Sequence, residues 1–249
     1  MKRLLILLTL FSMAVPSLAY QKEHRGLFFQ TALGFSYLNT QYDDTYKSDY
    51  QRNCNYSSNS EENPDQCRSV EIYSHSFSGF SFPEVNVKLG ASIGNMVVLF
   101  STLDVGNVFG HAKAQNTEYD ENVTKGTVHS VDFDDKLSDK DAPGFEFAAG
   151  LGFYVYPFRN PQSPLNGLFI GTSSGLGGYI VTPRGDYSTD LEFLNIYTRY
   201  EIGKDWWITD TWSLGFGIAY QSMFSNEPID GDGIDSDHKF SIAIRLTRG

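Results

Sequence analysis

Beyond its first residues, the chain has no apolar run long enough for a membrane-spanning helix, which needs about 20 consecutive apolar residues. Its 2 cysteines are too far apart in the sequence to form a CxxC redox motif. Basic residues are few, with Lys+Arg 19 against Asp+Glu 30 and a formal net charge of −11. Nucleic acid is therefore not an expected partner, because phosphate recognition demands a basic face. These absences leave an exported soluble protein or a β-barrel as the candidate classes.

Motifs for catalysis are also missing. No GxSxG nucleophile elbow is present, and the glycines of 175–178 lack the strand-to-helix setting of a phosphate loop. His75 precedes Ser76, and His129 precedes Ser130. Neighbours in an extended strand point to opposite faces, so neither pair predicts a nucleophile with its base. We therefore expect no enzyme and no cofactor.

The first residues have the layout of a secretory signal. Lys2 and Arg3 precede an apolar segment from Leu4 to Val15, and small residues follow up to Ala19. We predict a signal peptide over residues 1–19 and a single domain over 20–249. The alternative is an N-terminal anchor helix, which the short apolar segment disfavours.

The last eleven residues alternate between large apolar side chains and small or polar ones. Phe240 and Ile242 would lie on one face of a strand, and Ser241 and Arg245 on the other. Seven further segments follow the same pattern. The predicted strands are 26–38, one that ends with 85–91, 96–105, 145–155, 168–180, 194–202, 212–221 and 239–249. In the third, Val98 and Phe100 interrupt the polar face.

Apolar groups on one face with glycine, serine and charges on the other describe a wall between lipid and a polar lumen. An even number of strands lets an antiparallel barrel close, which satisfies every backbone hydrogen bond in lipid. Long and short connections alternate along the chain, as they do when one rim faces the periplasm and the other the exterior. The sequence therefore predicts an all-β fold, an eight-stranded antiparallel up-and-down transmembrane barrel with long extracellular loops.

With these strands and loops, the chain resembles the small eight-stranded outer-membrane barrels of the OmpX-like and OmpA N-terminal-like group. The resemblance is one of architecture and covers residues 20–249. It implies that the protein lies in the bacterial outer membrane, in contact with its lipid and lipopolysaccharide. It also implies insertion by the barrel-assembly machinery and a monomeric state.

Strand parity places a set of charged residues in the lumen. They are Glu84, Lys88, Asp104, Glu146, Arg199, Glu201 and Arg245. Cations and anions in this set can pair, so the first interpretation is a structural ion-pair network that fills the barrel. The alternative is a gate that opens a narrow pore when pairs rearrange.

Aromatic residues cluster beside two predicted short turns. They are Tyr154, Tyr156, Phe158, Trp206, Trp207 and Trp212. Tyrosine and tryptophan prefer the membrane interface, where one end of the ring is wet. We predict a girdle on the periplasmic side; ordinary core aromatics are the alternative.

The predicted loops carry further candidates. Cys54 and Cys67 are expected to form a disulfide in an exported protein, with two free thiols as the alternative. A weak calcium candidate lies in the last loop at Asp230, Asp232, Asp235 and Asp237. The EF-hand spacing is missing, so a solvated acidic loop is favoured and no metal site is predicted.

Two loop segments, 69–73 and 126–133, have strand-like character. We predict that strands from these loops extend beyond the membrane as a protruding sheet, whose open edges could recruit a partner strand. The function predicted is a non-enzymatic outer-membrane barrel that supports the envelope or presents acidic loops for adhesion to an extracellular ligand. A narrow gated channel and, less favoured, a lipid-modifying barrel enzyme are the alternatives.

Overall fold

We describe a computed structural model of the chain over residues 26–53, 66–94, 96–122, 127–130, 135–182, 191–224 and 236–249. The predicted signal peptide and parts of the long connections lie outside these residues. Within them, no helix is both long enough and apolar enough to cross a membrane.

Nine strands make up the described part of the chain. Their bounds are β1 Gly26–Asn53, β2 Gln66–Ile93, β3 Val97–Asn122, β4 Thr127–Ser130, β5 Asp135–Val155, β6 Leu168–Val181, β7 Leu191–Trp207, β8 Trp212–Phe224 and β9 Ser236–Arg248. Every pairing is antiparallel, and the order β2-β1-β9-β8-β7-β6-β5-β3 is closed by pairing of β2 with β3. The eight long strands thus form a closed up-and-down barrel, which confirms the predicted fold. Among the described residues, the short β4 pairs with β3 alone and lies outside that ring.

Side chains alternate across the barrel wall as the sequence predicts. On β1, Leu33 is 54% exposed while the adjacent Ala32 is 7% exposed. The outward positions of the other strands are also large and apolar, such as Leu151 and Ile244. An exterior of this kind is stable only in lipid, because it would otherwise expose a continuous apolar surface to water.

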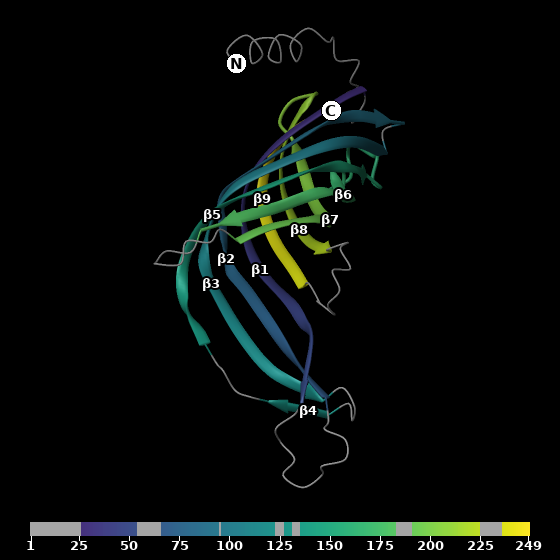
Figure 1. Ribbon diagram of the computed structural model, residues 1–249. Helices are drawn as coiled ribbons and strands as arrows, with labels where there is room; N and C mark the ends of the chain where they lie inside the picture. Colours follow the sequence, from purple (N-terminus) through teal and green to yellow (C-terminus); the bar gives the residue numbers. More distant parts are fainter. Residues whose placement is uncertain are drawn as a thin grey trace, which may run out of the picture.

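Four strands continue past the closed barrel. β9 pairs with β1 only as far as Gln41, opposite Ser236, and β6 begins to pair with β5 only at Gly144. Beyond these points β1, β2, β3 and β5 run away from the ring toward β4 (Figure 1). We call this extension, made of residues 42–53, 66–75, 112–122, 127–130 and 135–142, the protruding sheet. It confirms the predicted extension and shows that much of the predicted long loops is strand.

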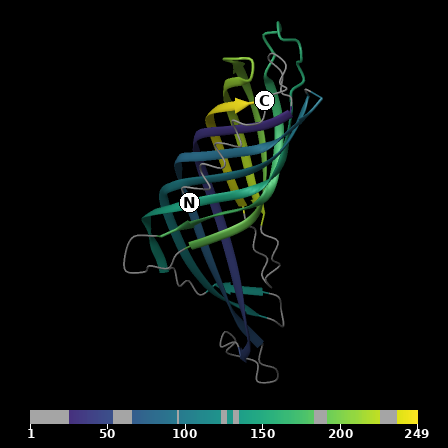
Figure 2. The same ribbon diagram turned by 90° about the horizontal axis from the view of Figure 1, so that it is seen from above.

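The strands bend where the barrel passes into the protruding sheet (Figure 2). Register shifts occur between Ser81 and Glu84 in β2 and between Ala112 and Ala114 in β3. Such bulges add twist and change the direction of a strand. Between them Gly79 pairs with Gly110, and a Cβ on Gly79 would lie 2.8 Å from the ring of Phe77. Glycine is needed at this pair because the strands and an inner ring approach so closely.

Candidate functional site

A network of charged side chains fills the middle of the barrel. The structure places all seven predicted lumen charges inside, each with little exposure. Arg199 lies at the centre of one group, with its Nη1 3.0 Å from Asp104 Oδ1 and 3.3 Å from Glu84 Oε1. Its Nε lies 3.4 Å from Glu201 Oε1, so one guanidinium contacts carboxylates from three strands. Such multiple pairing is what makes buried charges tolerable in a narrow lumen.

A second group of charges joins β2, β7 and β9. Lys88 Nζ donates to both oxygens of Glu201, at 3.1 and 2.9 Å. Arg245 Nε lies 3.1 Å from Asp205 Oδ1, and the Arg245 Nη2 group donates to the Tyr156 hydroxyl at 3.3 Å. The Tyr154 hydroxyl donates to Glu201, which connects this group to the buried aromatic residues at the short-turn end of the lumen. The network therefore ties together strands on opposite sides of the ring.

Two charged members of the network were missed by the sequence analysis. Lys239 Nζ lies 3.0 Å from Glu84 Oε1 and 2.9 Å from Glu146 Oε2. Lys239 shares the parity of Arg245, so extending the alternation of the last strand to its first residue would have found it. Asp205 was missed because the predicted sixth strand ended at residue 202, whereas β7 continues to Trp207.

An aromatic layer closes the lumen on the side of the short turns. It contains Phe28, Val98, Phe100, Tyr154, Tyr156 and Phe169, all buried. The rings of Phe100 and Tyr154 have centroids 4.6 Å apart, and Tyr154 meets Phe169 edge-on at 4.8 Å. Val98 and Phe100, which interrupt the polar pattern of the third predicted strand, are thus members of this layer.

Cations of the charged network lie directly on the aromatic layer. Lys88 Nζ is 5.2 Å from the centroid of Tyr154, and Arg245 Cζ is 3.8 Å from that of Phe169. A cation over an aromatic face is attracted by the ring quadrupole, and the attraction is larger where water is excluded. The charged network and the aromatic layer consequently support each other.

The predicted interface aromatics lie in two different environments in the structure. Tyr154 and Tyr156 are 0% and 3% exposed and point into the lumen, so their assignment to the membrane interface is wrong. The physical reason is parity, because both share the face of the inward Glu146.

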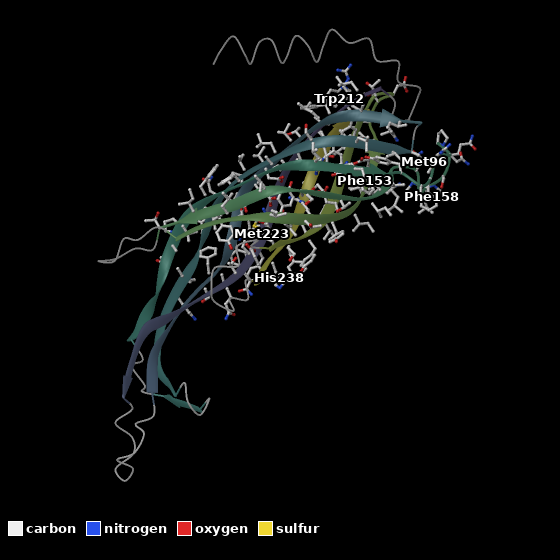
Figure 3. All side chains as sticks on the ribbon, turned by 45° about the vertical axis from the view of Figure 1, so that its right-hand side comes forward. Met96, Phe153, Phe158, Trp212, Met223 and His238 are labelled. Atoms are coloured by element: carbon white, nitrogen blue, oxygen red, sulfur yellow. The ribbon has the colours of Figure 1, made fainter. Side chains whose placement is uncertain are left out.

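The other predicted interface aromatics lie near the short turns. Phe158 and Trp206 are exposed, and Trp212 lies with Phe158 and Met96 at one end of the barrel (Figure 3). Trp207 donates through Nε1 to Asn166 Oδ1 at 2.9 Å, which fixes it against the turn before β6.

An apolar layer closes the opposite end of the lumen, where Met223 lies (Figure 3). Its members include Leu38, Phe77, Val108, Ala142, Tyr179, Val181, Tyr197 and Met223. Tyr179 makes hydrogen bonds with Thr40 and with Asp237 Oδ2, the latter at 2.8 Å. These contacts join β1, β6 and β9 across the end of the lumen nearer the protruding sheet.

Among the described residues of the lumen, the charged network encloses a small cavity. A cavity among Gln30, Asn86, Arg199, Glu201 and Arg245 measures about 20 Å³. That volume suits one ordered water, and unpartnered buried atoms such as Gln30 Oε1 could bind it. The arrangement is that of a plugged barrel, in which ion pairs and rings occupy the interior.

The remaining candidates fall mostly beyond the described residues. Cys54 and the side chain of Cys67 lie outside them, so the disulfide stays a prediction. The same holds for Asp230, Asp232 and Asp235, while Asp237 is buried in the barrel and hydrogen-bonded to Tyr179. Among the described residues no group of three or more acidic, histidine or cysteine side chains could hold a metal ion.

No protein-family model matches the chain, and no curated protein matches it either. Several solved structures are similar in fold. OprG from Pseudomonas aeruginosa matches at 10% identity over 91% of this chain and 96% of that one, with a TM-score of 0.39. Ail of Yersinia pestis, in complex with the heparin analogue sucrose octasulfate, matches at 6% identity over 88% and 98%, with a TM-score of 0.38. The protease OmpT from Escherichia coli matches at 7% identity over 90% and 96%, with a TM-score of 0.38.

These identities and scores are too low to transfer a function. The fold is established by the closed eight-stranded ring and its apolar outer wall, which agree with the resemblance seen in the sequence. The chain is an outer-membrane β-barrel with a plugged lumen and a sheet that protrudes from one rim.

Proposed function

We propose that the protein is a non-conducting surface barrel that presents the protruding sheet to partners outside the cell, a role that requires no catalysis. One observation carries the proposal: β1 continues to Asn53 although its pairing with β9 ends at Gln41. Over residues 42–53 the described part of the chain therefore pairs β1 with β2 alone. Among the described residues, none pairs with the other edge of β1 there. An edge of this kind can accept a strand from a partner.

The plugged barrel supports this role by acting as a rigid anchor. Membrane strands need only about 9–11 residues, whereas β1 and β2 have 28 each. The excess length is the part that reaches the exterior. Closure of the ring leaves no barrel edge to pair with a second copy, so the proposal includes a monomer surrounded by lipid and lipopolysaccharide and inserted by the barrel-assembly machinery.

Charge indicates the kind of partner strand. The β1–β2 hairpin and its connection contain the acidic residues Asp43, Asp44, Asp49, Glu61, Glu62 and Asp65. A negative segment attracts cationic partners at long range and raises their association rate. The expected partner is an extended, cationic polypeptide segment.

The test measures binding of a fluorescent peptide of alternating threonine and valine that carries two lysines. One variant replaces residues 43–74 with a short turn between the paired Tyr42 and His75, which removes the open edge. The control variant replaces residues 117–134 with a turn between the paired Asn116 and Asp135, which removes β4 but keeps the edge. Fluorescence anisotropy follows binding, and a heat-dependent shift in SDS gel mobility shows that each barrel is folded.

We expect the wild type and the control variant to bind the peptide and the first variant to lose binding. The same peptide with alternate amides N-methylated should also fail, because methylation removes the backbone donors that pair with a strand edge. Equal binding of the methylated peptide, or full binding by the variant without the edge, would contradict the proposal.

A further inference from the structure

The outer wall has a groove where the barrel meets the protruding sheet. Its volume is about 430 Å³, which lies within the range of small-molecule sites. Tyr37, Phe80 and Phe109 line it from three neighbouring strands, and all three are 40–55% exposed. The Tyr37 and Phe80 rings have centroids 5.4 Å apart. This aromatic floor faces the lipid and fits an acyl chain.

Three polar residues form one end of the groove. Ser78 of β2 pairs with His111 of β3, and His111 pairs with Asp141 of β5. Directly opposed residues of antiparallel strands have Cβ atoms about 4.5–5.5 Å apart. All three side chains are exposed on the outer wall. The register therefore sets serine, histidine and aspartate side by side in that order.

The position of the His111 imidazole suits a base that activates a serine nucleophile. His111 Nδ1 lies 3.5 Å from Asp141 Oδ1. A carboxylate at Nδ1 favours the tautomer with the proton on Nδ1 and leaves Nε2 as the base, on the ring edge away from Asp141. Ser78 is the neighbour of His111 on the strand opposite to Asp141, which places a serine on the side of His111 away from the carboxylate.

The depth of these residues matches the position of lipid esters. Leu99 and Phe109 are outward residues of β3 that are 49% and 55% exposed. Ten residues span roughly 33 Å along a strand, and a tilt of about 40° reduces this to roughly 25 Å, the height of the apolar band. Phe109 thus marks the outer boundary of the hydrocarbon, and His111 follows at the level of the head groups. Ester carbonyls of membrane lipids lie at this boundary.

We propose that Ser78, His111 and Asp141 form a hydrolytic site for carboxylic esters of membrane lipids, with the acyl chain on the aromatic floor. Ser78 Oγ attacks the ester carbonyl carbon, and His111 Nε2 takes the hydroxyl proton. The bond to the lipid alcohol breaks, and the imidazolium returns the proton to that alcohol, which leaves an acyl-serine. Water then attacks the acyl-serine with His111 as base and releases the fatty acid and free Ser78.

Ester hydrolysis at this site goes beyond the proposed presentation of the protruding sheet and does not depend on it. None of the three residues lies within the segments 43–74 and 117–134 that are removed to test the strand edge. Loss of one function would therefore leave the other measurable.

The site is tested with an alkyl fluorophosphonate, which forms a bond from serine oxygen to phosphorus and expels fluoride. The full chain is inserted in liposomes, labelled and analysed by mass spectrometry, and hydrolysis of a long-chain nitrophenyl ester is measured in parallel. Variants are Ser78→Ala, His111→Gln and Asp141→Asn. Ser101→Ala is the control, because Ser101 is another exposed serine of the outer wall. The heat-dependent gel shift shows that each variant is folded.

We expect labelling at Ser78, no labelling in Ser78→Ala, and unchanged labelling in the Ser101 variant. Loss of the base in His111→Gln should slow labelling and hydrolysis by roughly 10²–10⁴-fold, and Asp141→Asn should slow both. Labelling of Ser101 to the same extent as Ser78 would overturn the proposal. So would ester hydrolysis that folded Ser78→Ala retains in full, or a folded wild type that is not labelled.

Discussion

At the scale of single residues, the contribution of the charged network to stability is tested most directly at the pair of Lys88 and Glu201. Replacing Glu201 with alanine removes the carboxylate 2.9 Å from Lys88 Nζ and leaves that cation buried. Breaking a buried pair costs about 3–5 kcal/mol because the remaining charge is not compensated. Urea unfolding of the barrel in liposomes, followed by tryptophan fluorescence, should show a loss of this size for Glu201→Ala.

The matched double variant Lys88→Met with Glu201→Gln removes both charges and should recover most of the lost free energy. Ser101→Ala on the outer wall should change the free energy of unfolding by less than about 0.5 kcal/mol. A Glu201→Ala barrel as stable as the wild type would show that the network does not stabilise the fold.

Lumen-facing residues could be predicted largely from parity, because a period of two assigns alternate side chains to the two faces. The seven predicted charges, from Glu84 to Arg245, all lie inside. The same rule applied to Tyr154 would have placed it inside as well. The preference of tyrosine for wet boundaries predicts the interface instead, but packing in the lumen overrides that preference here.

At the scale of strands, glycines allow inward-facing aromatic rings to pack directly against the backbone of a neighbouring strand. A Cβ on Gly171 of β6 would lie 2.2 Å from Tyr154 Cδ1 and 2.5 Å from the Phe153 carbonyl oxygen. Gly171→Ala should therefore destabilise the barrel by about 1–3 kcal/mol through overpacking. At Gly217 of β8 the nearest atom would be 3.6 Å away, in ordinary contact.

Gly217→Ala is the matched control for this prediction. It should be neutral or stabilise by about 0.5–1 kcal/mol, because alanine reduces the entropy of the unfolded chain. The same urea unfolding experiment measures both variants. If the two substitutions changed stability equally, the close approach of Tyr154 to β6 would not be what excludes a side chain at residue 171.

The existence and order of the barrel strands were readable from alternation, but their outer ends were not. Residues beyond Gln41 in β1 lose the apolar half of the pattern, so alternation does not mark the part of the strand that continues to Asn53. Pairing register is equally hidden in the sequence. Ser78, His111 and Asp141 are distant along the chain and become neighbours only through the pairings of β2 with β3 and of β3 with β5.

At the scale of the whole molecule, side chains fill the interior of the barrel, and both proposed functions lie on its outer surfaces. The charged network lies between an aromatic layer around Phe100 and an apolar layer around Phe77. Eight strands leave an interior just wide enough for side chains to fill. A path for ions would require both of these layers to move.

The most direct test of this central claim is the conductance of the purified full chain in a planar lipid bilayer, with insertion verified by the heat-dependent gel shift of protein recovered from matched liposomes. We predict a conductance equal to that of the protein-free bilayer, and no change on Arg199→Ala, because that substitution leaves both capping layers in place. Stable unitary current steps in the wild type, altered by Arg199→Ala, would contradict the plugged lumen and identify the charged network as the gate of a channel.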